Sequence, residues 1–136
     1  MPELDNPRRA LFRQLGSFVV VGIVCFALNA ILVELLVRHC GPLYAQVIAF
    51  PIVASVAWYL NRRYTFGASD RSVVQEWMHY IFANLLGWVA NNGVYVLLVF
   101  KLSLAARHPA IAVAAGSIAG LVFNFVISRA VVFRRA

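Results

Sequence analysis

The chain has 136 residues, of which 62% are hydrophobic and only 12% are charged. About a quarter of the residues of an ordinary soluble domain are charged, so this composition excludes a soluble globular domain and predicts a single membrane-embedded domain, residues 1–136. The net charge of +7 comes from short basic clusters between apolar runs, a distribution that argues against a nucleic-acid-binding surface.

Four apolar runs have the length of a transmembrane helix. They cover about residues 15–37, 43–60, 80–100 and 110–127. Pro42 and Pro109 stand directly before the second and fourth runs, where proline suits the first turn of a helix. The sequence therefore predicts an all-α polytopic membrane protein with four transmembrane helices.

Basic residues are distributed unequally between the two sides of these runs. Nine arginines lie on the side of the two termini, and three basic residues lie on the other: Arg38, Lys101 and Arg107. Loops rich in arginine and lysine stay in the cytoplasm during insertion. Both termini are therefore expected to be cytoplasmic.

The chain also contains an internal repeat. A shift of 67 residues places Pro42 on Pro109, Arg62 on Arg129 and Phe66 on Phe133. We interpret the protein as two helical hairpins of equal orientation, related as parallel repeats. Transport proteins built from repeats form their sites at the interface between them.

An arginine stands between aromatic residues at the end of each hairpin. Residues four apart share one face of an α-helix, which predicts that each arginine lies between two rings at the membrane boundary. These arginines either bind an anionic lipid phosphate in the planar guanidinium fork or act as interfacial anchors. The phosphate candidates are Arg62, Arg129, Arg63, Asn61 and Ser128, and the flanking rings are those of Trp58, Phe66, Phe125 and Phe133.

Several polar residues fall inside the apolar runs, where they must face a partner or a cavity. The candidates for a sugar-binding cavity are Asn29, Asn91, Asn92, Asn124 and Trp88; the alternative is hydrogen bonding and packing between helices. Glu34 is a candidate for proton coupling, or it forms an intrahelical ion pair with Arg38. No metal-ligand spacing or nucleophile–base pair is recognisable, so no cofactor, metal or enzymatic activity is expected.

The stretches "LNRRYTF" and "ISRAVVF" resemble the ends of the second and fourth helices in the GtrA-like family of small four-helix membrane proteins. Residues 61–66 match the first pattern, and Ser128, Arg129 and Phe133 match the second. Val131 and Val132 stand where that family often has an aromatic–aliphatic pair.

The resemblance implies a flippase in the bacterial cytoplasmic (inner) membrane. Such a protein would translocate a polyprenyl-phosphate-linked sugar, for example undecaprenyl-phosphate-hexose, for glycosylation of the cell envelope. Its expected partners are this lipid and the membrane lipids, with a glycosyltransferase and a second copy of the chain as further candidates. The alternatives are a non-transporting accessory subunit for a glycosyltransferase and a small multidrug-efflux transporter.

Overall fold

The computed structural model describes residues 6–135, and within that range every regular element is a helix, without a β-strand. The all-α prediction is confirmed. In chain order, the elements are α1 (Pro7–Leu60), η1 (Asn61–Thr65), α2 (Val73–Lys101), α3 (Ser103–Arg107), α4 (Pro109–Ile127) and η2 (Ser128–Val132).

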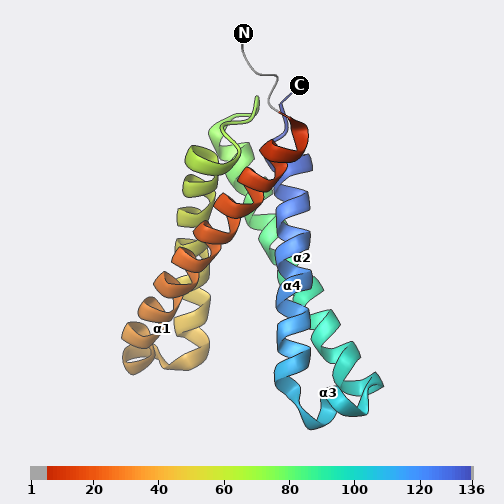
Figure 1. Cartoon of the computed structure of the whole chain (residues 1–136). Helices are drawn as coiled ribbons and strands as arrows, with labels where there is room; N and C mark the ends of the chain where they lie inside the picture. The colour runs from red at the N-terminus through yellow and green to blue at the C-terminus, as the bar shows by residue number, and fades with distance from the viewer. Residues whose placement is uncertain (1–5, 136) are drawn as a thin grey trace.

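The long helix α1 is folded back on itself at one residue. Gly41 has φ 81° and ψ 168°, a backbone conformation that suits a residue without a Cβ. Pro42 follows and begins the next helical segment with a φ that is already fixed. The bend divides α1 into a first arm, residues 7–40, and a second arm, residues 42–60, which together form the first hairpin (Figure 1).

The starts of α1, α2 and α4 each carry a recognisable signal. The Asn6 side chain accepts a 3.1 Å hydrogen bond from the Arg8 amide, and the Ser72 side chain accepts one of 3.3 Å from the Gln75 amide. These side-chain caps satisfy backbone donors that have no partner inside the helix. Pro109 occupies the first turn of α4, where its missing N–H costs nothing.

Helices α2 and α4 form the second hairpin, and small residues allow them to approach closely. A Cβ added to Gly116 would lie 2.6 Å from the backbone oxygen of Asn91, and one added to Gly120 would lie 3.2 Å from that of Gly87. Within a membrane, helix association depends on such close packing because lipid tails are as apolar as the side chains.

The two hairpins meet at one end of the molecule and diverge toward the other (Figure 1). We call the end with η1, η2 and both chain termini the terminal end. The opposite end, with Gly41 and α3, is the far end. The backbones of the two hairpins are therefore farther apart toward the far end than at the terminal end.

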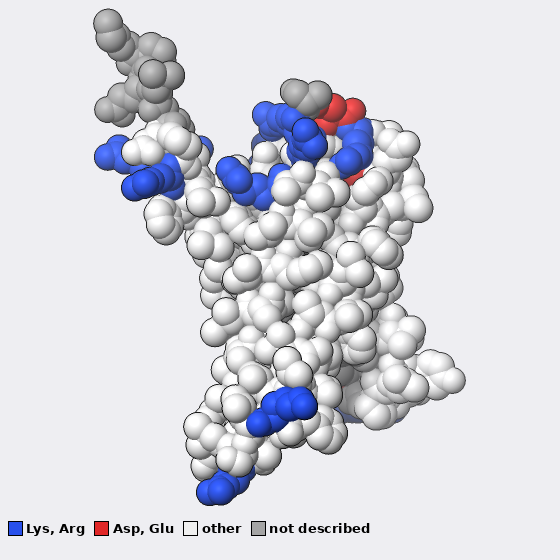
Figure 2. All heavy atoms as spheres, turned by 90° about the vertical axis from the view of Figure 1, so that its right-hand side faces the viewer, with Lys and Arg blue, Asp and Glu red and all other residues white. Residues whose placement is uncertain are grey.

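The outer surface is apolar between two charged ends. Large hydrophobic side chains such as Phe82 and Phe100 are exposed. Figure 2 shows most lysine and arginine side chains at the terminal end, fewer toward the far end and an uncharged band between them. Three helices, Pro7–Thr65, Val73–Lys101 and Pro109–Val132, are long and apolar enough to cross a membrane.

Candidate functional site

Each hairpin ends in a single π-helical turn. The Phe66 amide donates a 2.9 Å hydrogen bond to the Asn61 carbonyl, and the Phe133 amide donates one of the same length to the Ser128 carbonyl. Both bonds span five residues instead of four, which defines a π-turn. The turns η1 and η2 begin 67 residues apart, which is the shift that relates the two halves of the sequence.

The π-turns change which residues share a helix face. A π-turn holds more residues than an α-turn, so positions four apart no longer lie in one stripe. Phe66 and Phe133 are turned toward each other and stack, with ring centroids 5.1 Å apart and an interplanar angle of 15°. The ring contact of Phe66 and Phe133 is thus with each other, and their flanking of the arginines stays a prediction.

Phe66 and Phe133 belong to a cluster that joins the two hairpins. The Phe18 ring lies 6.0 Å from that of Phe66 and 5.4 Å from that of Phe125. Phe66 and Phe125 are 5.8 Å apart, and Tyr80 lies 5.8 Å from Phe133. We call Phe18, Phe66, Phe125 and Phe133 the phenylalanine cluster; it joins the two hairpins through contacts between their rings.

Arg62 lies beside a buried carboxylate. Its Nε donates a 3.0 Å hydrogen bond to Oε1 of Glu76, whose side chain is fully buried, and its guanidinium lies 5.8 Å from the centroid of the Trp58 ring. The indole N–H of Trp58 donates to the same oxygen at 3.0 Å. Ser69 donates to Oε2 through its amide, at 2.7 Å, and through its hydroxyl, at 2.5 Å. The carboxylate is thus fully satisfied, and one ring, Trp58, contacts Arg62 as expected.

The other two arginine candidates are more exposed than Arg62. The Nε of Arg129 donates a 2.9 Å hydrogen bond to the side-chain oxygen of Gln14 in the first arm. Arg63 is exposed and, with Arg62, Tyr59, Gly67 and Ala68, borders a surface pocket of about 290 Å³. The two arginines that the repeat relates therefore lie at the same end of the molecule in different surroundings.

Asn61 and Ser128 lie inside the protein, away from the lipid boundary at which we expected them to bind phosphate. Each has only 1% of its surface exposed. The Nδ2 of Asn61 donates a 2.9 Å hydrogen bond to the hydroxyl of Tyr80. The Oδ1 of Asn61 and the hydroxyl of Ser128 are buried without a hydrogen-bond partner.

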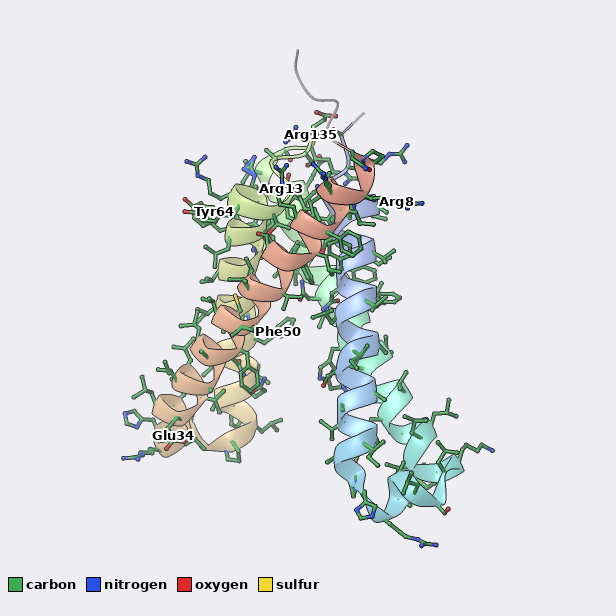
Figure 3. The ribbon with its side chains drawn as sticks, in the orientation of Figure 1. Arg8, Arg13, Glu34, Phe50, Tyr64 and Arg135 are labelled. Atoms are coloured by element: carbon green, nitrogen blue, oxygen red, sulfur yellow. The ribbon has the colours of Figure 1, made fainter. Side chains whose placement is uncertain are left out.

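A cavity of about 430 Å³ lies between the hairpins and is lined by both arms of α1, by η1, by α2 and by α4. Most of its wall is apolar, including Phe50 on the second arm (Figure 3). Six amide side chains interrupt that wall: Asn29, Gln46, Asn61, Asn84, Asn91 and Asn124. From Gln46 to Asn61 the second arm rises by roughly 22 Å, so the amides extend over much of a bilayer's depth.

The comparison with protein families decides the identity of this fold. The family model described as GtrA/DPMS, transmembrane domain, matches residues 17–135. The chain belongs to this family. The resemblance that the helix ends suggested is confirmed, and the protein is a multi-pass membrane protein. No match was found among curated proteins or among solved structures.

Two of the predicted sugar-site residues of this GtrA/DPMS domain lie away from the cavity's interior. Asn92 is exposed and donates through Nδ2 to the carbonyl of Trp88 at 2.8 Å, a bond within its own helix. Trp88 borders the cavity but is 63% exposed. The residues that the structure does bring together there are Asn29, Asn91 and Asn124.

Glu34 lies at the far end of the first arm, outside the residues that line the cavity (Figure 3). Its carboxylate is 3.6 Å from the guanidinium of Arg38, and both side chains are largely exposed. The intrahelical ion pair is therefore present. Proton coupling through Glu34 stays a prediction.

Sequence reasoning missed three residues that shape the site of this GtrA/DPMS domain: Glu76, Gln46 and Tyr80. Glu76 stands in the first turn of α2 after the Ser72 cap, between the second and third apolar runs of the sequence. The only signal for Glu76 in the sequence is that it is an acidic residue close to a basic cluster. Gln46 is a single amide near the start of the second apolar run, and Tyr80 is the first residue of the third run.

Proposed function

We propose that this GtrA/DPMS protein is a flippase that moves a polyprenyl-phosphate-linked sugar across the bacterial cytoplasmic (inner) membrane for cell-envelope glycosylation. The family match supports a role in the translocation of lipid-linked sugars or in glycosylation. Within this proposal the protein is a transporter without enzymatic activity, and its substrate is the sugar-bearing lipid.

The proposed topology has four membrane spans. The bend at Gly41 turns the long α1 into two antiparallel arms, and the second arm alone has a helical length of roughly 28 Å, close to one hydrocarbon thickness. Together with α2 and α4, these arms make two hairpins of equal orientation. The nine arginines at the terminal end favour a cytoplasmic location for both termini.

The observation that carries the proposal is the amide-lined cavity. A sugar head cannot cross hydrocarbon unless its hydroxyl groups exchange water for other hydrogen-bonding partners. Six amide side chains line one cavity of about 430 Å³ and offer such partners, and the rest of the cavity wall is mostly apolar. That volume falls in the range of about 300–1,000 Å³ typical of sites for small molecules.

The arginines supply the phosphate end of the proposed pathway. Arg62 and Arg63 border the small pocket at the terminal end, and Arg129 lies at the same end. A guanidinium binds phosphate oxygens in a planar fork. Because the phenylalanine cluster joins the hairpins, the proposed transport cycle includes a separation of Phe66 from Phe133 that lets the sugar head pass.

The experiment is a flipping assay in liposomes that contain the purified protein alone. A fluorescent short-chain prenyl-phosphate hexose is placed in both leaflets, and a membrane-impermeant reductant reports the fraction that exchanges. We expect protein-dependent exchange for this lipid and none for a prenyl alcohol of the same length. Absence of exchange, with export restored only by an added glycosyltransferase, would support the accessory-subunit alternative instead.

The choice of arginine variants must take into account the ion pair between Arg62 and the buried Glu76. Arg62→Ala would leave a buried carboxylate without its cationic partner, so a loss of transport could reflect misfolding. Arg62→Lys keeps a positive charge but not the planar fork. We expect the Arg62→Lys and Arg129→Ala double variant to lose most exchange while keeping its melting temperature. Arg107→Ala, at the far end, is the matched control and should exchange normally.

A further inference from the structure

Two amide oxygens in the cavity wall have no hydrogen-bond partner. They are the Oδ1 atoms of Asn61 and Asn124, both buried. Nearly all buried polar atoms in proteins are satisfied, and an unpaired one is expensive to maintain. Both residues line the same cavity, so a single ligand in that space would lie beside both side chains.

The surroundings hold both amides in place. Nδ2 of Asn61 is bound to the hydroxyl of Tyr80, a residue with only 2% of its surface exposed. Tyr80 in turn packs against the Phe133 ring. The Asn124 side chain occupies the space where a Cβ of residue 87 would be, because residue 87 is a glycine. Both acceptors are therefore preorganised, and neither can turn freely to find another donor.

The chemistry of these atoms selects the ligand. An amide oxygen accepts hydrogen bonds and cannot donate them. An ionised phosphate also only accepts, so it gains nothing from either oxygen. A sugar hydroxyl donates, and several hydroxyls on one ring can serve two acceptors at once. Ser128 also has an unpartnered hydroxyl, but it does not line the cavity and is not part of this set.

We propose that Asn61 and Asn124 form a hydroxyl-recognition subsite, which binds the sugar of a lipid-linked substrate through its O–H donors and does not bind its phosphate. The identification of the ligand as the sugar of a lipid rests on the proposed function. In this proposal Asn61 binds the sugar, whereas the sequence had suggested it as a phosphate ligand. It also separates the two recognition tasks in space, with the arginines outside the phenylalanine cluster and the asparagines inside the cavity.

The test uses three small probes on the full chain in lipid nanodiscs: an alkyl hexoside, the same hexoside with every hydroxyl O-methylated, and an alkyl phosphate. O-methylation removes the donors but keeps the ring. We expect the unaltered protein to bind the alkyl hexoside at least about tenfold more tightly than its O-methylated form, since several hydrogen bonds are lost. This arm needs no variant and so does not depend on whether a variant folds.

Variants then locate the subsite. Asn61→Leu and Asn124→Leu should each weaken hexoside binding roughly fivefold and leave alkyl-phosphate binding unchanged. Asn92→Leu is the matched control, because Asn92 is exposed and outside the cavity, and its hexoside affinity should not change. Equal binding of the two hexosides, no binding of either, or equal loss of hexoside and phosphate binding in the asparagine variants would overturn the subsite.

The outcome is separable from that of the proposed function. If hexoside binding depends on the two asparagines but the liposomes show no exchange, the subsite stands and the flippase proposal fails. If exchange occurs while the asparagine variants bind the hexoside normally, the flippase proposal stands and the subsite fails.

Discussion

Arg62 and Glu76 form the ion pair that ties the end of the first hairpin to the start of the second. The Arg62 Nε lies 3.0 Å from a carboxylate oxygen of Glu76, and the Glu76 side chain has no exposed surface while that of Arg62 is 26% exposed. The pair is therefore asymmetric: Arg62 can reach the surface pocket that it borders, but Glu76 has no route to solvent. A phosphate at this pocket would compete with Glu76 for the same guanidinium.

The asymmetry predicts unequal and coupled effects of substitution. Arg62→Ala should destabilise the protein by about 2–3 kcal/mol, because it leaves a buried carboxylate with only neutral donors. In the Arg62→Ala, Glu76→Gln double variant the unpaired charge is gone, and part of the stability should return. A double-mutant cycle of detergent unfolding should give a coupling of about 1–3 kcal/mol. Strictly additive losses would show that the two side chains do not stabilise each other.

The stacked rings of Phe66 and Phe133 lead to a second prediction. Phe133 is only 4% exposed and contacts Phe66 and Tyr80, so Phe133→Ala should cost about 3 kcal/mol of unfolding free energy. The matched control is Phe100→Ala, since that ring is 82% exposed at the far end and should change stability little. Both variants can be compared by thermal unfolding in the same detergent. A similar loss in the two would mean that the cluster does not hold the hairpins together.

Periodicity and charge predicted the helical architecture because those signals are local. Hydropathy marked the apolar runs, proline marked the starts at Pro42 and Pro109, and the repeat placed Arg62 and Arg129 at corresponding positions. The same shift of 67 residues relates the two π-turns, although nothing in either stretch alone indicates a π-turn. A π-turn is less favourable than an α-turn, so it forms where tertiary packing stabilises it.

The site was harder to predict because it depends on contacts between distant segments. Asn61 and Ser128 look like residues at a membrane boundary in sequence, yet both are buried in the folded protein. Glu76 looks like a solvated residue of a link until Trp58, Arg62 and Ser69 surround it. The amides were recognisable as a class, since polar groups in hydrocarbon must face something, but their convergence on one cavity follows only from the fold.

The close contact between α2 and α4 predicts a strong dependence on one glycine. Gly116→Ala would place a Cβ 2.6 Å from the backbone oxygen of Asn91, so the two helices must separate. We expect a loss of about 1–3 kcal/mol, the usual cost of overpacking. Gly93→Ala is the control, because a Cβ there meets nothing within 4 Å and alanine favours the helix. Thermal unfolding should separate the two; equal melting temperatures would contradict the contact.

The orientation proposed from charge is testable by cysteine labelling. The background variant carries Cys25→Ala and Cys40→Ala, which remove both native thiols. Single cysteines are then placed at Ala68, exposed at the terminal end, or at Ala106, exposed in α3 at the far end. A membrane-impermeant maleimide added to intact cells should label Ala106→Cys and not Ala68→Cys. Inverted vesicles should reverse that pattern, and permeabilised cells should label both. Labelling of Ala68→Cys from outside intact cells would place the arginine-rich end outside and reverse the direction of the proposed phosphate entry.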